Sequence, residues 1–212
     1  MSIILVHEFG HLFAALVLRW KIDKIYVYPL GGIVKFNESI NRNIIEEFFV
    51  VVSGPIFQIL YSYILFSLQI NNCLFFSNLL LCYNLLPIYP LDGGKICNMI
   101  FSYFFSYKIS FFISVLISFI FFVFSFIYFV FCLKNYFFIF VFFSLFFKLI
   151  DEVNDYAFLY NKFLLERYLF DFKFSRFSYS KDVFSFYRNR KHFLYKGGIM
   201  ISESRMLNDY FK

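Results

Sequence analysis

Two histidines and a glutamate near the start of the chain have the spacing of a zinc hydrolase. His7 and His11 are four residues apart, so on a helix they share one face and both rings can reach one metal ion. Glu8 can take a proton from a metal-bound water. Two other interpretations stay open: chance, or two imidazoles that satisfy each other where helices pack. Ionisable groups in apolar runs are costly and usually functional, which favours the metal site.

The composition is that of an integral membrane protein. Of 212 residues, 61% are hydrophobic and 26% aromatic, and mean hydropathy is +0.69. We therefore expect a mainly α, polytopic transmembrane protein in which residues 1–150 form the membrane core and residues 151–212 a small tail domain. About five spans are predicted, at residues 3–18, 48–70, 73–91, 109–133 and 136–147.

Glycine and proline mark two further features of this core. Residues 24–36 are β-branched and aromatic around the turn signal Pro29-Leu30-Gly31-Gly32, which predicts a short membrane-associated β-hairpin. Gly54 and Pro55 interrupt the second span, where they serve either helix packing or function.

The third span ends in helix-breaking residues close to an acidic side chain. Pro87 and Pro90 stand three residues apart, shortly after Asn84 and before Asp92-Gly93-Gly94. Non-helical backbone at membrane depth is tolerated only where protein or a water-filled cavity satisfies it, so this stretch is a candidate active-site wall. Asp92 is then an oxygen ligand that completes the protein shell of the metal, with water in the open position; otherwise it caps a helix end.

The basic residues predict an orientation. If the five spans alternate, every Lys and Arg except Lys134 falls on one side, which places the tail in the cytosol. The net charge of +6 is then a positive-inside signature, supported by anionic lipid of the bilayer, and no nucleic-acid partner is expected. The tail of about sixty residues is marginal for a core of its own, so it folds against the membrane part or a partner. His192, beside Lys191, is expected at the surface.

Taken together, these motifs resemble the site-2 protease family of intramembrane zinc metalloproteases, peptidase family M50. The resemblance rests on His7-Glu8-Phe9-Gly10-His11, on Ser53-Gly54-Pro55 and on the segment from Asn84 to Gly94. More specifically, the sequence resembles the sporulation stage IV factor B branch of this family. Its signals are Pro29-Leu30-Gly31-Gly32, Glu46-Glu47-Phe48 and Phe163-Leu164-Leu165-Glu166-Arg167-Tyr168.

The resemblance implies a site with one zinc ion per chain. His7, His11 and Asp92 would be its ligands, and Glu8 the general base. Asn84, Pro87 and Pro90 would position the substrate. The structural motif positions would be Gly31, Gly32, Gly54, Pro55, Gly93 and Gly94.

The resemblance also implies a biological setting. The substrate would be a membrane-associated protein, in the sporulation branch a pro-sigma factor, cut in or near its membrane segment. A membrane partner would block the site until it is needed. The location would be the bacterial cytoplasmic membrane or the membrane around the forespore. The end of the tail, residues 190–211, looks like the closing part of a cystathionine-β-synthase-type domain.

One rival interpretation comes from another class of protein. Only six residues precede His7, so the alternative is a catalytically inactive, N-terminally shortened membrane scaffold that binds partners. Zinc content and dependence on Glu8 separate the two.

Overall fold

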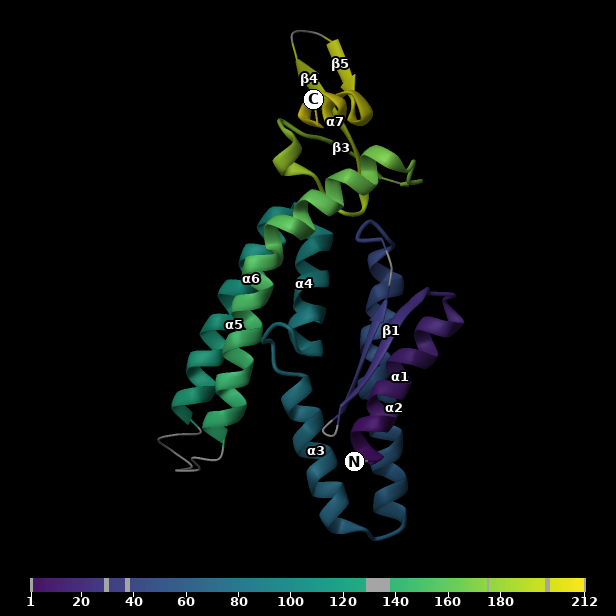
Figure 1. Ribbon diagram of the computed structural model, residues 1–212, viewed down its shortest axis with the longest axis vertical. Coiled ribbons are helices and arrows are strands. Elements are labelled where there is room, and N and C mark those ends of the chain that lie inside the picture. The colour runs from purple at the N-terminus through teal and green to yellow at the C-terminus, as the bar shows by residue number, and fades with distance from the viewer. Residues whose placement is uncertain are drawn as a thin grey trace. The chain divides into compact units, whose positions relative to one another are not determined.

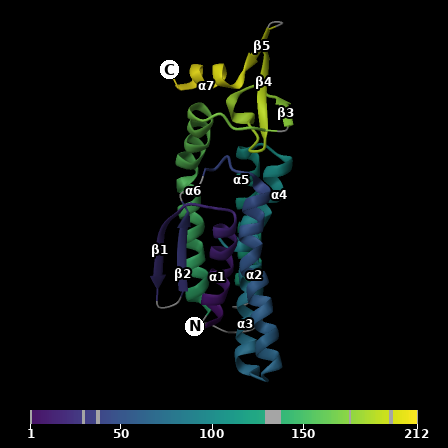
Figure 2. The same ribbon diagram turned by 90° about the vertical axis from the view of Figure 1, so that its right-hand side faces the viewer.

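The computed structural model describes residues 2–28, 31–36, 39–128, 138–174, 176–196 and 199–211 (Figure 1; Figure 2). The described part is mainly helical, as predicted. It divides into two compact units. The first comprises Met1–Glu38, Ile45–Pro87 and Leu91–Ile96, and the second Ser39–Ile44, Ile88–Pro90 and Cys97–Lys212.

The first unit begins with a helix followed by a hairpin. Helix α1 (Ser2–Val17) leads into strands β1 (Ile22–Tyr28) and β2 (Gly31–Phe36), which pair antiparallel, and β2 lies beside α1. Hence the predicted hairpin is confirmed. Gly31 and Gly32 are the first residues of β2, opposite Tyr28 and Val27. The other two residues of the turn signal lie outside the described residues.

Helix α2 (Ile44–Ser67) packs closely on α1 because both carry glycine at the crossing. A Cβ at Gly10 would lie 2.6 Å from the Ser53 carbonyl oxygen and 3.0 Å from the Gly54 Cα. The Ser53 hydroxyl donates to the Gly10 carbonyl across the same contact, at 2.8 Å. Small residues and interhelical hydrogen bonds are what hold helices together in lipid.

Helix α3 (Asn71–Asn84) stops where the prolines predict a break, and seven residues separate it from α4 (Asp92–Phe104). The predicted third span, residues 73–91, therefore extends seven residues beyond the end of the observed helix. Pro87 has no N–H and disfavours helical backbone before it. Helix α4 is not among the elements predicted from the sequence. It begins at Asp92, because an acidic side chain in a first turn suits the helix dipole.

In the second unit, α4 packs on α5 (Tyr107–Ile127) through polar side chains. Ser114 donates to Asn98 Oδ1 at 3.3 Å, and Ser102 donates to Ser110 at 3.0 Å. Helix α5 also lies beside α6 (Phe138–Leu169), where Phe111 and Tyr156 stack with ring centroids 4.4 Å apart. Buried serines let an apolar helix approach its neighbours closely.

Two described helices, α2 and α5, are long and apolar enough to cross a membrane, and α1 is apolar but shorter. Five spans are not confirmed. Residues 129–137, which include the end of the predicted fourth span and the start of the predicted fifth, lie outside the described residues. The membrane core is predicted to end at residue 150, but helix α6 continues through this residue without a break. The division into a membrane core and a tail therefore stays a prediction.

The elements that follow α6 pack on its end. Strand β3 (Arg176–Tyr179) pairs parallel with β4 (Arg190–Lys196), which pairs antiparallel with β5 (Ile199–Ser202), and α7 (Glu203–Phe211) follows. A short 3-10 turn, η2 (Val183–Ser185), precedes β4. The core of this region consists of Tyr107, Tyr160, Phe163, Leu164, Phe186, Met206 and Leu207.

Candidate metal centre

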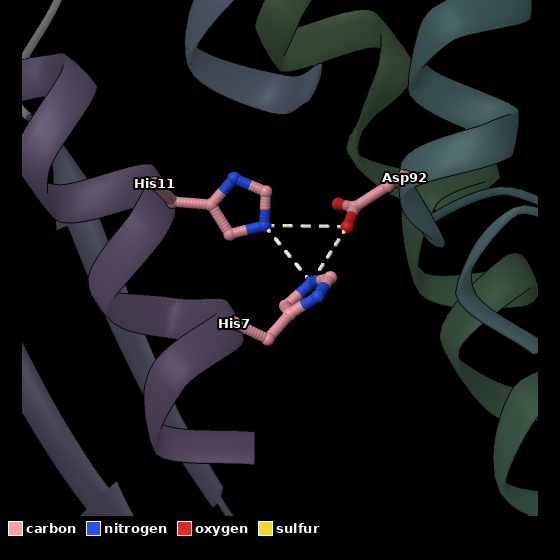
Figure 3. A group of neighbouring side chains, drawn as sticks. All are labelled: His7, His11 and Asp92. Carbon is pink, nitrogen blue, oxygen red and sulfur yellow. Dashed lines mark hydrogen bonds and ion pairs between the residues drawn. The ribbon is translucent and has the colours of Figure 1, made fainter. Parts of the chain in front are cut away.

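Three donor atoms converge in the first unit. His7 and His11 project from successive turns of α1, and Asp92 projects from the first turn of α4 (Figure 3). Asp92 Oδ2 lies 2.9 Å from His7 Nε2 and 3.2 Å from His11 Nε2, and the two Nε2 atoms are 3.1 Å apart. The side chains are 4%, 14% and 8% exposed for His7, His11 and Asp92, so water screens the cluster little.

The hydrogen bonds on the far side of each ring assign its protons. His7 Nδ1 faces Gln58 Oε1 at 2.8 Å, and His11 Nδ1 faces the Val50 carbonyl at 2.9 Å. The Val50 carbonyl can only accept, so His11 Nδ1 carries a hydrogen, and the same holds for His7 if the amide oxygen faces it. Both Nε2 atoms then present lone pairs to each other and to a carboxylate. The two lone pairs and the carboxylate repel one another unless a cation or a shared proton lies between them.

The donor set fits zinc. Two imidazoles and one carboxylate are a common protein shell of a catalytic zinc ion, with the fourth position open. In a tetrahedral site with bonds of 2.0–2.1 Å, neighbouring ligand atoms stand about 3.3 Å apart. The three observed separations, 2.9, 3.1 and 3.2 Å, are close to that value. Zinc-binding histidines usually donate their other ring N–H to an acceptor in this way, and the contact fixes the tautomer and the orientation of the ring.

Other predicted residues surround this cluster. Glu8 is half-buried beside His7, and its carboxylate interacts electrostatically with both histidines and with Lys95. Asn84, the last residue of α3, points its Nδ2 at His7 Nε2 from 3.4 Å. Lys95 Nζ lies 3.7 Å from Asp92 Oδ1, the oxygen that faces away from the histidines. The cluster therefore has a base, an amide donor and a cation around it.

Two of the motif glycines leave room for the site. A Cβ at Gly54 would overlap the His11 ring, and a Cβ at Gly93 would overlap the carbonyl oxygens of Leu85 and Leu86. Glycine at 54 thus lets the Nε2 edge of the ring lie directly against α2, and glycine at 93 lets the start of α4 pack on the end of α3. Gly94 is buried in the same turn.

Pro55 lies in α2 next to Gly54. It has no N–H to donate to the carbonyl of Val51, four residues back, and this loosens the helix there. In the same stretch the Val50 carbonyl accepts hydrogen bonds from His11 Nδ1 and from the Ser53 hydroxyl, at 2.9 and 2.6 Å.

Pro87 and Pro90 lie in the irregular segment between α3 and α4, and the Tyr89–Pro90 peptide is cis. The Tyr89 N–H donates to the Ser118 hydroxyl of α5 at 2.9 Å. A protein side chain therefore satisfies non-helical backbone here, as the sequence analysis requires of this stretch.

The comparisons with known proteins point to one family. Residues 1–74 match the model of peptidase family M50. Stage IV sporulation protein FB of Bacillus subtilis is 35% identical over 111 residues, which is 48% of this chain and 38% of that protein. A zinc metalloprotease of Methanocaldococcus jannaschii is 30% identical over 111 residues, which is 47% of this chain and 32% of that protein.

The predicted resemblance to the M50 family is confirmed. The solved site-2 protease of Methanocaldococcus jannaschii adds a likeness of fold, with a TM-score of 0.57 at 24% identity. It covers 71% of this chain and 74% of that one. The chain spans less than two fifths of the length of the sporulation protein FB and of the zinc metalloprotease that it matches.

Sequence reasoning missed several residues around the M50 motifs. Gln58 is fully buried and contacts His7, yet it lies 51 residues away in the sequence. Ser118, in an apolar run of α5, carried no signal either. A glutamine or serine within an apolar span is the only trace that a sequence offers of such a role, and it does not name the partner.

The expectation for His192 was wrong. It is fully buried, stacked on Phe186 with ring centroids 4.3 Å apart, and its Nε2 accepts the Tyr187 N–H at 2.9 Å. Burial lowers the pKa of His192 below 6.5, against the opposing effect of the Glu203 carboxylate. Side chains alternate along a strand, so the charge of Lys191, the preceding residue of β4, did not predict the face on which His192 lies.

Proposed function

We propose that this protein is an intramembrane zinc metalloendopeptidase. The observation that carries the proposal is the convergence of His7 Nε2, His11 Nε2 and Asp92 Oδ2, with both histidine Nδ1 atoms bonded to buried acceptors. These three residues would hold one zinc ion. The M50 match, the zinc metalloprotease relative and the composition support the same activity.

The chain's own residues would carry the proton transfers. A bound zinc ion lowers the pKa of a water and polarises the scissile carbonyl. Glu8 takes a proton from the attacking water and returns it to the leaving amine nitrogen as the C–N bond breaks. Asn84, whose amide faces the same site, would position the substrate backbone together with Pro87 and Pro90.

The substrate would be a membrane-associated protein. A helix hides its carbonyls in its own hydrogen bonds, so the segment to be cut must first be extended. In the described residues β1 and β2 form a two-stranded sheet, and a strand edge can accept an extended peptide by β-augmentation. Substitutions that break strand pairing at residues 26–28 should slow cleavage; unchanged cleavage would remove the hairpin from the mechanism.

A pro-sigma factor is the substrate that we propose to test, because the sporulation protein FB of Bacillus subtilis is similar to 48% of this chain. The location would be the cytoplasmic membrane or the membrane around the forespore, with the tail in the cytosol. An inhibitory membrane partner would control access to the site.

The test is cleavage of a tagged, membrane-tethered pro-sigma-type protein that is co-expressed with the chain. Wild type should release the shortened product, and Glu8→Gln should not. If neither cuts this protein or other tethered substrates, while the protein is inserted and folded, the inactive scaffold becomes the better account.

A further inference from the structure

A buried glutamine connects the candidate metal centre to two other helices. Gln58, on α2, has no exposed surface. Its Oε1 lies 2.8 Å from His7 Nδ1, and its Nε2 donates to the Ser77 carbonyl of α3 at 2.8 Å. One side chain therefore spans from the ring on α1 to the backbone of α3.

The two contacts fix which way the amide faces. A backbone carbonyl can only accept, so the NH2 group of Gln58 must face Ser77. Its oxygen must then face His7, and an amide oxygen can only accept. His7 therefore carries its hydrogen on Nδ1 and its lone pair on Nε2, the atom that faces Asp92 and His11.

We propose that Gln58 is a positioning residue that selects the metal-binding tautomer of His7 and holds its ring. This inference rests on the proposed function, because it assigns a role within that zinc site. Without the Gln58 acceptor, the neutral ring could place its hydrogen on Nε2 and donate to Asp92, which would close the site against a cation. Outer partners of zinc-binding histidines act in this way on metal affinity.

A competing role for Gln58 is to join α2 to α3 by packing alone. A second contact between these helices does that without touching His7: the hydroxyls of Ser62 and Ser77 lie 2.7 Å apart, both buried. Ser77→Ala removes this contact but keeps the backbone carbonyl that Gln58 uses. It is therefore the matched control for packing.

The experiment measures zinc affinity by competition with a coloured chelator, on full-length protein in detergent, and records the visible spectrum after Co²⁺ substitution. The variants are Gln58→Met, which keeps the volume and loses both hydrogen bonds, and Gln58→Glu. A buried neutral Glu can donate O–H to the Ser77 carbonyl and still accept from His7. It should therefore rescue the site.

Gln58→Met should weaken zinc binding by about 10–100-fold and shift the Co²⁺ bands. Gln58→Glu and Ser77→Ala should bind as wild type does. Wild-type zinc affinity and an unchanged Co²⁺ spectrum in Gln58→Met would overturn the positioning role and leave the protease proposal intact. An equal loss of zinc affinity in Ser77→Ala would do the same. If wild type binds no zinc, or binds it equally after His7→Ala, the proposed function fails and the role of Gln58 fails with it.

Discussion

Gly54 lies against the imidazole of His11, so that even a single methyl group at residue 54 would occupy the space of the ring. The ring is held on its other side by the Val50 carbonyl, 2.9 Å from Nδ1. Gly54 of α2, which has no side chain, therefore determines the position of His11 Nε2, a donor atom of α1.

Gly54→Ala should displace the His11 ring. A shift of about 1 Å in a catalytic group can cost about 100-fold in rate, so we expect a loss of that order in kcat. The measurement is cleavage of the tethered substrate by purified protein. The control is Ile56→Ala on the exposed face of α2, which should cut as wild type does. Full activity in Gly54→Ala would show that the ring is not held as described.

Ser118→Ala should loosen the segment that leads into Asp92. The substitution removes the acceptor of the Tyr89 N–H, and a hydrogen bond of this kind contributes about 0.5–1.5 kcal/mol to stability. We expect faster hydrogen exchange at Tyr89. Ser125→Ala, on the same helix and half-buried, is the control. Equal exchange rates in the two variants would exclude a role for the Ser118 hydroxyl.

Arg167→Met should unfold the tail in part. The guanidinium is 1% exposed, pairs with Glu203 at 2.9 Å and donates to the carbonyls of Tyr187 and Arg188. Removing one partner of a buried pair costs about 3–5 kcal/mol, because the other charge stays buried. Thermal unfolding followed by circular dichroism measures the loss.

The control for Arg167 is Lys191→Met. Lys191 pairs with Asp171 at 3.4 Å, and Asp171 is 90% exposed, so water screens the pair. Exposed pairs contribute about 0–1 kcal/mol. Similar unfolding temperatures for Arg167→Met and Lys191→Met would contradict the buried network.

The tail should also lose stability in acid. Because burial lowers the pKa of His192 below 6.5, the unfolded chain takes up a proton before the folded one, and stability falls as pH drops below about 6.5. The slope for one such group is at most about 1.4 kcal/mol per pH unit. Thermal unfolding of the tail measured against pH tests this, with His192→Gln expected to flatten the first part of the curve.

A second acid loss should follow at lower pH in the wild-type protein. Burial raises the pKa of Glu203, but the hydrogen bonds from His192 and the charge of Arg167 outweigh it and leave that pKa below 4.5. Its stabilising effect is present above pH 4.5 and disappears as pH falls through the folded pKa. If His192→Gln unfolded with the wild-type pH dependence near 6.5, the neutral buried histidine would be wrong.

Features that depend on local spacing could be predicted from sequence. His7 and His11 share a helix face by number alone, and Pro87 ends α3 by its chemistry. Contacts between residues that are far apart in the sequence could not be predicted. Nothing near Gln58 indicates His7, and the charges after residue 147 suggested the end of a helix that continues to Leu169. Charged residues end an apolar run, but Lys, Glu and Arg are good helix formers, so a helix can continue through them.

The most direct test of the account compares zinc content and cleavage in the same preparations of wild type, Glu8→Gln and Asp92→Ala. We expect one zinc ion per chain and cleavage in wild type, a zinc ion without cleavage in Glu8→Gln, and neither in Asp92→Ala. Cleavage by Glu8→Gln at the wild-type rate, or full zinc content in Asp92→Ala, would contradict the central claim.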